Sequence, residues 1–360
     1  MHFLMKILFA AGGSIGHIAP CIAVWRAVEK RSPDASAHFV CSTAMDDQTF
    51  LQKEGVAFTA LSGRRVSLFA LPLMLLQAWM MIGREKPDAV FSKGGGVTIP
   101  VAIAAWMRGI PIVVHESDAV PGRATRFISK FARSVCYGFQ NGSEKLKVKS
   151  EKCFPSNIYT GNPVRTDITL GSRERGLNLT GFSGSRPVLL VMGGSQGAQT
   201  LNDAVAKHLD ELLRSVDIVH ITGVGKSGAA EKSGYWTRPF VHDELADLYA
   251  ITDLALSRAG AGSIGELAAN GIPAILVPLE GLAQNHQVKN AEAAARSGGC
   301  IILKQAGLDT ELVAIVRNLA EHDEIRTAMS AKMRTLHKPD ADVAVAKILL
   351  AAAAERCGVS

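Results

Sequence analysis

The sequence contains one local pattern twice, and this repeat limits the folds open to the chain. Residues 6–10 (KILFA) form an apolar run that leads into the glycine-rich residues 12–17 (GGSIGH), and residues 187–192 lead in the same way into residues 193–198 (GGSQGA). Each copy has the pattern of a buried strand, a glycine turn and the start of a helix. Because the second copy begins half a chain length after the first, the repeat predicts two similar domains in tandem.

Further short apolar runs alternate with helical stretches in both halves. They comprise residues 37–42, 89–91, 112–115 and 135–137 in the first half and 217–221, 254–256, 274–277 and 300–303 in the second. This alternation predicts an α/β protein with two Rossmann-like domains, each a parallel sheet with helices on both faces. Because ligands bind beyond the carboxyl ends of such strands, both glycine segments are expected to face one central cleft.

The junction between the domains is expected near the middle of the chain. Gly161-Asn162-Pro163-Val164-Arg165 and residues 171–186, which are rich in glycine, serine and charge, have the composition of connecting segments. We therefore predict an N-terminal domain at residues 1–164 and a C-terminal domain at residues 165–342. Residues 343–360 are predicted to form an alanine-rich helix that packs back on the N-terminal domain.

Composition narrows the possible partners. Lys and Arg (39) exceed Asp and Glu (33), and the net charge of +6 favours anionic partners such as phosphates or an acidic lipid surface. Aromatic residues are only 6%, basic residues are scattered and no zinc-finger spacing occurs, so we expect no nucleic-acid binding. The six cysteines are widely spaced without a CxxC pair, which indicates a reducing cytoplasm.

One apolar segment raises the question of membrane contact. Residues 66–82 (VSLFALPLMLLQAWMMI) barely reach the length of a bilayer core and contain Pro72 and Gln77, so we expect no membrane span. Basic residues flank the segment on both sides: Arg64, Arg65, Arg84 and Lys86. This pattern fits either a buried helix of an α/β domain or a helix that dips into an anionic lipid surface.

The glycine segments indicate phosphate binding, because glycine lets backbone N–H groups approach an anion at a helix N-terminus. A glycine segment can also serve only as a tight turn between strand and helix. Neither segment has the GxGxxG pattern of a dinucleotide site, and no GxxxxGK[ST] motif for ATP occurs. A further glycine-rich turn at residues 257–267 leads into a helix that carries Glu266. The Glu266 carboxylate can accept two hydrogen bonds from a ribose diol, or it can serve only to stabilise the N-terminal end of the helix dipole.

Two histidines follow predicted strands. His17 ends the first glycine segment, where a neutral imidazole is a suitable base for an alcohol near pH 7. His115 ends the apolar run at residues 112–115, and either histidine is also compatible with a structural capping role. The ten histidines lack an HExxH motif or close pairs, so we expect no metal site.

Taken together, these segments resemble the MurG family of peptidoglycan glycosyltransferases, which have the GT-B fold. The resemblance rests on residues 12–20, 94–96 (GGG), 115–118 (HESD) and 161–165 (GNPVR) in the first half and on residues 193–198, 258–266 and 285–291 (NHQVKNA) in the second. It implies transfer of N-acetylglucosamine from UDP-N-acetylglucosamine to the C4 hydroxyl of lipid I, the undecaprenyl-linked acceptor, with inversion at the anomeric carbon. It further implies a peripheral enzyme at the anionic cytoplasmic face of the cell membrane, without a cofactor, and contacts with other cell-wall synthesis proteins.

The resemblance also implies roles for individual residues. His17 is the expected catalytic base. The implied acceptor-binding residues are Gly13, Ser14, Gly16, Gly95, Gly96, His115 and Asp118. The implied donor-binding residues are Arg165, Ser195, Gln196, Gly262, Ser263, Glu266, His286 and Gln287. Membrane contact is implied for Leu68, Phe69, Leu73, Leu76 and Trp79.

The departures from the family pattern all lie on the acceptor side. Ile15 stands where the family usually has a glycine, Gly96 replaces a common aromatic residue, and Ile99 stands where a small residue is usual. Three alternatives therefore stay open: a related enzyme with another lipid acceptor, a UDP-sugar 2-epimerase, and a noncatalytic protein that binds a nucleotide sugar at the membrane surface.

Overall fold

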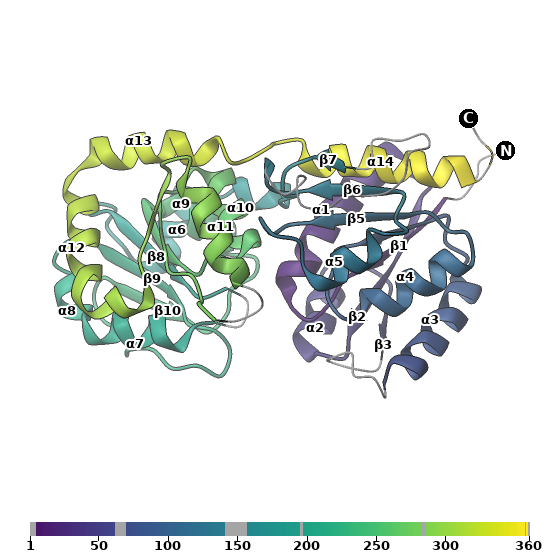
Figure 1. Cartoon of the computed structure of the whole chain (residues 1–360). Coiled ribbons are helices and arrows are strands. Elements are labelled where there is room, and N and C mark those ends of the chain that lie inside the picture. Colours follow the sequence, from purple (N-terminus) through teal and green to yellow (C-terminus); the bar gives the residue numbers. More distant parts are fainter. Residues whose placement is uncertain are drawn as a thin grey trace. The chain divides into compact units, whose positions relative to one another are not determined.

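The computed structural model describes residues 5–61, 70–140, 157–194, 197–281, 285–356 and 358. The chain forms two compact units (Figure 1). Unit 1 comprises residues 1–164 and 338–360, and unit 2 comprises residues 165–337. The sequence analysis placed residues 338–342 in the second domain, whereas the structure groups them with unit 1.

Unit 1 is built on a parallel sheet in the order β3-β2-β1-β4-β5-β6-β7. Its strands are β1 (Lys6–Ala10), β2 (Ser36–Ser42), β3 (Phe58–Leu61), β4 (Ala89–Ser92), β5 (Ile112–Glu116), β6 (Ser134–Tyr137) and β7 (Asn157–Tyr159). Along β1, Ile7 and Phe9 pack into one apolar cluster while Leu8 and Ala10 pack into another. Because successive side chains of a strand point to opposite faces, both faces of this sheet are buried.

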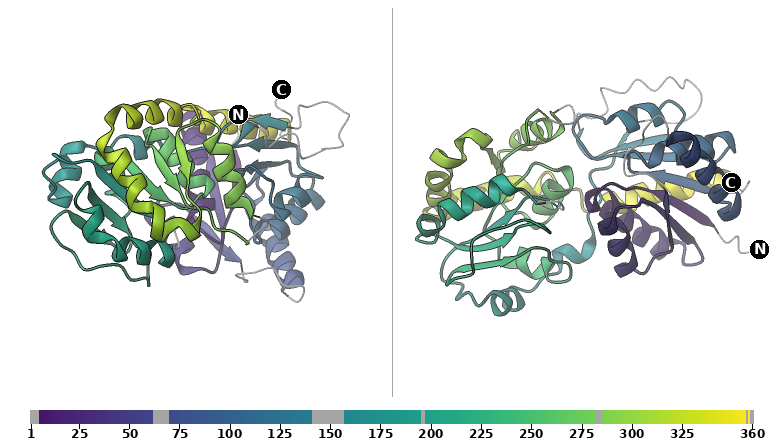
Figure 2. Two further views of the ribbon diagram at one scale, coloured as in Figure 1. Left: turned by 60° about the vertical axis from the view of Figure 1, so that its left-hand side comes forward. Right: turned by 90° about the horizontal axis from the view of Figure 1, so that it is seen from below.

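Helices cover both faces of the unit 1 sheet. They are α1 (Ile15–Arg31), α2 (Met45–Lys53), α3 (Leu71–Glu85), α4 (Thr98–Met107), α5 (Arg123–Ile128) and α14 (Ala341–Arg356). On one face α1 and α14 contribute Ile18, Val24 and Leu349 to the core, and on the other α3 and α4 contribute Met74 and Val101. The C-terminal helix α14 packs against α1, as the views in Figures 1 and 2 show.

Unit 2 repeats this architecture with a parallel sheet in the order β10-β9-β8-β11-β12-β13. Its strands are β8 (Val188–Met192), β9 (Asp217–Ile221), β10 (Tyr235–Arg238), β11 (Leu254–Ser257), β12 (Ala274–Leu276) and β13 (Cys300–Ile302). Its helices are η2 (Thr166–Thr169), α6 (Arg173–Thr180), α7 (Gln199–Lys207), α8 (Leu209–Leu212), α9 (Leu245–Ile251), α10 (Ala261–Asn270), α11 (His286–Ala295), η4 (Gln305–Gly307), α12 (Leu308–Glu321) and α13 (Asp323–Arg334). The α/β fold class expected from the sequence is thereby confirmed.

In each sheet the chain first adds strands toward one edge and then, from the centre, adds the remaining strands toward the other edge. In unit 1 the reversal lies between β1 and β4, which pair directly, and in unit 2 it lies between β8 and β11. Connections that leave neighbouring strands in opposite directions open a crevice beyond the carboxyl ends of those strands. Residues 12–17 follow β1 and residues 193–198 follow β8, so each predicted glycine segment begins at such a reversal.

Three strands were not predicted from the sequence: β3, β7 and β10. Each lies at the edge of its sheet, and each includes partly exposed residues. An edge strand is covered less completely than a central one, so an apolar run reveals it less reliably, and of the edge strands that the structure describes only β13 was predicted.

The packing of α14 leads to a stability prediction. Leu349 is fully buried against the α1 side of unit 1, so Leu349→Ala should lower the free energy of unfolding by about 2–5 kcal/mol through lost burial and a residual cavity. The exposed neighbour Lys347 gives a matched control, and Lys347→Ala should change stability by less than about 0.5 kcal/mol. Urea denaturation followed by tryptophan fluorescence measures both, and equal midpoints would contradict the packing argument.

Candidate active site

The two glycine loops of unit 1 meet at the reversal of its sheet. The first is residues 12–17 after β1, and the second is residues 94–96 after β4. A Cβ atom on Gly95 would lie 2.8 Å from Gly12 O and 3.6 Å from His17 Nδ1. Gly95 also has φ +91°, a conformation that L side chains rarely adopt. Close approach and backbone conformation thus both require glycine here.

His17 lies at this meeting point, in the first turn of α1, and is partly exposed. Its Nδ1 is 3.1 Å from Gly12 O. Because a carbonyl oxygen can only accept, Nδ1 carries the proton of this hydrogen bond, and in the neutral imidazole Nε2 has the lone pair. A partly exposed imidazole whose Nε2 has a lone pair is chemically able to act as a general base.

Asp47 holds the first glycine loop in place, and the sequence analysis did not identify it. Its side chain is fully buried at the start of α2. Oδ2 accepts hydrogen bonds from the Gly13 amide at 2.8 Å and from Ser42 Oγ at 2.6 Å. A buried carboxylate that accepts a backbone N–H fixes the direction of that amide. The signal available in the sequence was an acidic pair, Asp46-Asp47, shortly after a strand.

His115 lies at the end of β5 and is fully buried. Its Nε2 is 2.9 Å from Gly161 O, so Nε2 carries the proton, and Nδ1 accepts from Lys93 Nζ at 3.0 Å. Burial, together with the charge of Lys93, holds the pKa of His115 well below its usual range, so the imidazole stays neutral. The acceptor-binding role implied for His115 stays a prediction, and the side chain as it stands can act only through its neighbours.

Glu116 orders the loop that follows β5. Its carboxylate accepts from the Asp118 amide at 3.0 Å and from the Gly122 amide at 2.9 Å. Burial, and then the nearby charge of Asp118, raise the pKa of Glu116. Glu116 therefore fixes the backbone at Asp118, which is one of the implied acceptor residues.

In unit 2, the glycine loop after β8 is similarly constrained. A Cβ on Gly193 would lie 2.2 Å from the Ala198 amide, and Gly194 and Gly197 have φ of +81° and +64°. The loop leads directly into α7. Ser195 and Gln196, two of the implied donor residues, lie outside the described residues. The described part retains the geometry in which backbone N–H groups and a helix start favour an anion.

Glu266, Tyr249 and Arg165 form the main polar cluster of unit 2. The Tyr249 hydroxyl donates to Glu266 Oε2 at 2.8 Å. Burial raises the pKa of Glu266, while the Tyr249 hydrogen bond and the charge of Arg165 act in the opposite direction. Gly262 and Ser263 lie in the first turn of the same helix, α10. The structure thus groups four implied donor residues, and adds Tyr249, which the sequence analysis missed.

Two further implied donor residues begin α11. Gln287 Oε1 accepts from the Leu279 amide at 3.0 Å and so holds the loop after β12, while His286 is the first residue of the helix. From the same helix, Asn290 donates to Ala259 O at 3.1 Å and supports the turn that precedes α10. The α10 and α11 starts are therefore tied together within unit 2.

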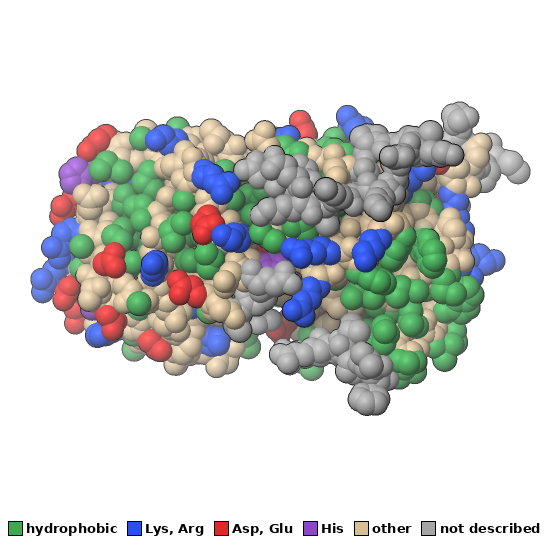
Figure 3. All heavy atoms as spheres, in the orientation of Figure 1, with side chains coloured by type: hydrophobic (Ala, Val, Ile, Leu, Met, Phe, Trp, Pro, Cys, Tyr) green, Lys and Arg blue, Asp and Glu red, His purple; other side chains and the backbone are tan. Residues whose placement is uncertain are grey.

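Unit 1 carries an exposed apolar surface, which we call the apolar face (Figure 3). It includes Leu73, Leu76 and Trp79, as implied, and also Met80, Trp106, Met107 and Phe127, which were not anticipated. Leu68 and Phe69 lie outside the described residues. The same helix α3 buries Met74, Ala78, Met81 and Ile82, which confirms core packing for one side of the helix, while membrane contact by the exposed side stays a prediction.

Exposed basic residues border the apolar face: Arg84, Arg108, Arg123, Arg126 and Lys130. The Arg108 guanidinium lies 3.9 Å above the ring of Trp79, and such a contact stabilises both exposed side chains. Among the described residues, no helix is long and apolar enough to span a bilayer.

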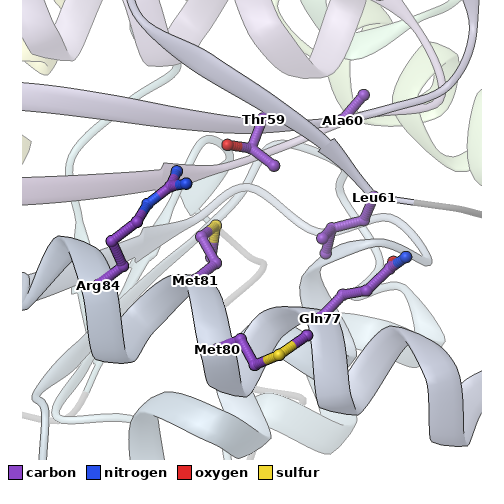
Figure 4. A pocket seen from close by; sticks show the side chains of 7 residues that line it. All are labelled: Thr59, Ala60, Leu61, Gln77, Met80, Met81 and Arg84. Atoms are coloured by element: carbon purple, nitrogen blue, oxygen red, sulfur yellow. The ribbon is translucent and has the colours of Figure 1, made fainter.

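A pocket of about 300 Å³ opens between β3 and α3 (Figure 4). It is lined by Thr59, Ala60, Leu61, Gln77, Met80, Met81 and Arg84. None of these residues belongs to the glycine loops, so the pocket is separate from the His17 site. In the ranges that the structure describes, no cluster of three or more His, Cys, Asp or Glu side chains is suited to hold a metal ion.

Family models match both halves of the chain. Residues 7–137 match the N-terminal domain of glycosyltransferase family 28, and residues 188–345 match its C-terminal domain. A UDP-N-acetylglucosamine–N-acetylmuramyl-(pentapeptide) pyrophosphoryl-undecaprenol N-acetylglucosamine transferase of Bacillus cereus is 36% identical over 341 residues, covering 91% of this chain and 95% of the relative. A transferase of the same name from Clostridium botulinum is 34% identical and covers 89% of this chain and 93% of its own.

Solved structures show the same fold. The crystal structure of Acinetobacter baumannii MurG superposes with a TM-score of 0.72 at 24% identity and covers 96% of this chain and 99% of that chain. A UDP-GlcNAc 2-epimerase from Neisseria meningitidis bound to UDP-GlcNAc superposes with a TM-score of 0.69 at 13% identity, covering 98% and 100%. At these identities the superpositions establish the architecture, which glycosyltransferases and epimerases share.

The contacts of Asp47 lead to a prediction for the first glycine loop. Asp47→Ala removes a charged acceptor from Gly13 and Ser42 and should lower the free energy of unfolding by about 2–3 kcal/mol. Hydrogen exchange at the Gly13 amide should accelerate as well. Asp46→Ala, at the exposed neighbouring position, is the control and should leave both unchanged. Unaltered exchange at Gly13 in Asp47→Ala would show that the carboxylate does not hold the loop.

Proposed function

Because the chain belongs to glycosyltransferase family 28, we propose that it transfers N-acetylglucosamine from UDP-N-acetylglucosamine to the C4 hydroxyl of the N-acetylmuramyl sugar in lipid I, forming lipid II for peptidoglycan. The observation that carries this proposal is the site in unit 1, where His17 lies beside two glycine loops and the bond from Nδ1–H to Gly12 O leaves the lone pair on Nε2. The names of relatives that cover about nine-tenths of the chain support the same reaction.

Unit 1 is proposed to bind the acceptor. Backbone N–H groups of the loops at residues 12–17 and 94–96 meet the lipid diphosphate, since glycine permits the close approach that a phosphate needs. His17 Nε2 accepts the proton of the attacking hydroxyl. The hydroxyl oxygen forms the new bond to the anomeric carbon while the bond from that carbon to the diphosphate oxygen breaks, and the electron pair leaves with UDP.

Unit 2 is proposed to bind the donor. The Glu266 carboxylate accepts hydrogen bonds from the ribose hydroxyls, and Arg165 lies in the same cluster. The glycines Gly193, Gly194 and Gly197 and the start of α7 are assigned to the diphosphate, where backbone N–H groups stabilise the charge that develops on the leaving group. Gln287, Gly262 and Ser263 complete the donor site near the sugar. Attack from the side opposite the leaving group inverts the configuration at the anomeric carbon.

The apolar face is proposed to bind the anionic cytoplasmic side of the cell membrane. Its exposed Leu73, Leu76 and Met80 supply apolar area, and the bordering Arg and Lys side chains supply attraction to acidic lipid. Peripheral attachment brings unit 1 to an acceptor whose isoprenoid chain stays in the bilayer.

The direct test is an assay of the purified protein with labelled UDP-N-acetylglucosamine and a lipid I analogue. Transfer of label to the acceptor together with release of UDP supports the proposal. Conversion of the donor to UDP-N-acetylmannosamine without acceptor would instead identify an epimerase, and transfer to another lipid would redefine the acceptor. Tight donor binding with no turnover would identify a noncatalytic protein.

Two substitutions should separate the roles of the units. His17→Ala should lower kcat by about 100-fold or more, within the usual contribution of a general base, and change UDP affinity less than about twofold. Glu266→Ala should do the reverse, weakening UDP binding while a donor-saturated reaction keeps most of its kcat. Steady-state kinetics and calorimetric UDP titrations measure both. Unchanged turnover in His17→Ala would remove this residue from the role of base.

The membrane proposal predicts a loss of vesicle binding. The double variant Leu76→Ser/Met80→Ser should bind phosphatidylglycerol vesicles about 30-fold more weakly, since the two side chains together contribute on the order of 2 kcal/mol of apolar transfer. Leu170→Ser, at an equally exposed leucine of unit 2, is the matched control. Flotation with vesicles checks this, and equal binding by all three proteins would reject the assignment of the apolar face.

A further inference from the structure

Lys93 is a buried cation next to the glycine loop at residues 94–96, and the proposed reaction does not use it. It follows β4 directly, precedes Gly94, and is only 3% exposed. Its Nζ donates to His115 Nδ1 at 3.0 Å and to Ser117 Oγ. In the part of the chain that the structure describes, no carboxylate forms an ion pair with it. A buried ammonium bonded only to neutral acceptors costs folding free energy, so its presence calls for a role besides stability.

His115 links Lys93 to a second segment. Its Nδ1 accepts from the ammonium, while its Nε2–H donates to Gly161 O at 2.9 Å. Only the neutral ring with the proton on Nε2 can make both hydrogen bonds. The charged or titratable groups around the pair are Glu116 at the end of β5, Asp118 just after it, and the Cys21 and Cys136 thiols from α1 and β6. Burial raises the pKa of both thiols to about 12, so they remain uncharged.

Gly161 belongs to the segment that leads into unit 2, whose first residue is Arg165. The returning chain re-enters unit 1 at Lys338, and the two passages touch within that unit: a Cβ on Gly161 would lie 2.7 Å from Lys338 Cβ. Lys338 Nζ also lies 3.8 Å above the ring of Tyr159. Asn162 Nδ2 donates to Ser117 O at 3.2 Å, which ties the outgoing passage to the end of β5 a second time.

At its other end, this series of contacts reaches the glycine loop at residues 94–96. Gly94 and Gly95, next to Lys93, adopt φ of +82° and +91°, and Gly95 packs on Gly12 and beside His17. Continuous hydrogen bonds therefore run from the residue before this loop, through one imidazole, to the backbone of the connecting segment.

We propose that Lys93 and His115 are positioning residues that hold the glycine loop at residues 94–96 and the connecting segment at residues 161–164 in one fixed arrangement. The inference rests on the proposed function, because it assigns that loop to the acceptor. Lys93 and His115 do not touch the substrate in this assignment. Their loss misplaces the acceptor and His17 relative to the chain that enters unit 2, and leaves the donor residues of unit 2 intact.

The test compares Lys93→Met, His115→Leu and the double variant with a water-soluble acceptor analogue. Each single variant should lower kcat about tenfold or more while UDP affinity, measured by calorimetry, stays within about twofold. Because the two residues act in series, the double variant should lose no more than the worse single variant. Lys53→Met, at an exposed lysine of unit 1, is the control and should match the wild type. Wild-type turnover in Lys93→Met, or additive losses in the double variant, would overturn the proposal.

Two readouts separate positioning from mere support of the fold. His115→Gln keeps one acceptor and one donor and should recover part of the kcat that His115→Leu loses. Lys93→Met removes a charge that lowers the pKa of His115, so nitrogen chemical shifts of this ring should show titration at higher pH than in the wild type. No recovery by Gln together with an unshifted titration would contradict the link. If the wild type itself fails to use the acceptor, the proposed function is wrong, while the titration still reports on the Lys93–His115 contact.

Discussion

The reversal of strand order in each parallel sheet is the constraint on which the rest of the structure depends. At the reversal the neighbouring connections diverge, and backbone N–H groups at the carboxyl ends of two adjacent strands are left open to a ligand. Unit 1 places two glycine loops there, after β1 and β4, and unit 2 places one glycine loop and the start of α10 there, after β8 and β11. One architectural feature, repeated, thus supplies the two edges to which the proposed function assigns the acceptor and the donor.

The loops at these edges depend on buried polar side chains from elsewhere. In unit 1, Asp47 fixes the amide of Gly13, and Glu116 fixes the loop after β5. In unit 2, buried Asn202 donates through Nδ2 to Thr222 O and accepts through Oδ1 from His220 Nε2–H, beside the loop that contains Gly197. Glycine-rich backbone has high conformational entropy when it is unsupported, so such contacts are needed to keep its N–H groups aimed at one point.

The sequence predicted those features that burial and local chemistry determine. Central strands appear as apolar runs because both faces are covered, and the glycine loops appear because no other residue fits their φ angles. Edge strands such as β3 are only partly covered and were missed. The supporting residues were missed for another reason: Asp47 lies 34 positions from Gly13, Lys93 lies 22 from His115, and Tyr249 lies 17 from Glu266. Those pairings exist only once the sheets have formed, so a local pattern cannot reveal them.

The two units support their sites with opposite electrostatics. Unit 2 places Tyr249 and Arg165 beside Glu266, and both favour its charged form against the larger effect of burial, so the carboxylate suits a neutral partner such as a diol. Unit 1 instead buries the cation Lys93 against the neutral rings and hydroxyls of His115 and Ser117. A positive charge in that position disfavours protonation of His115 and favours an anion at the adjacent loop. In the proposed reaction, the unit assigned to the lipid diphosphate therefore carries the buried cation, and the unit assigned to the ribose diol carries the carboxylate.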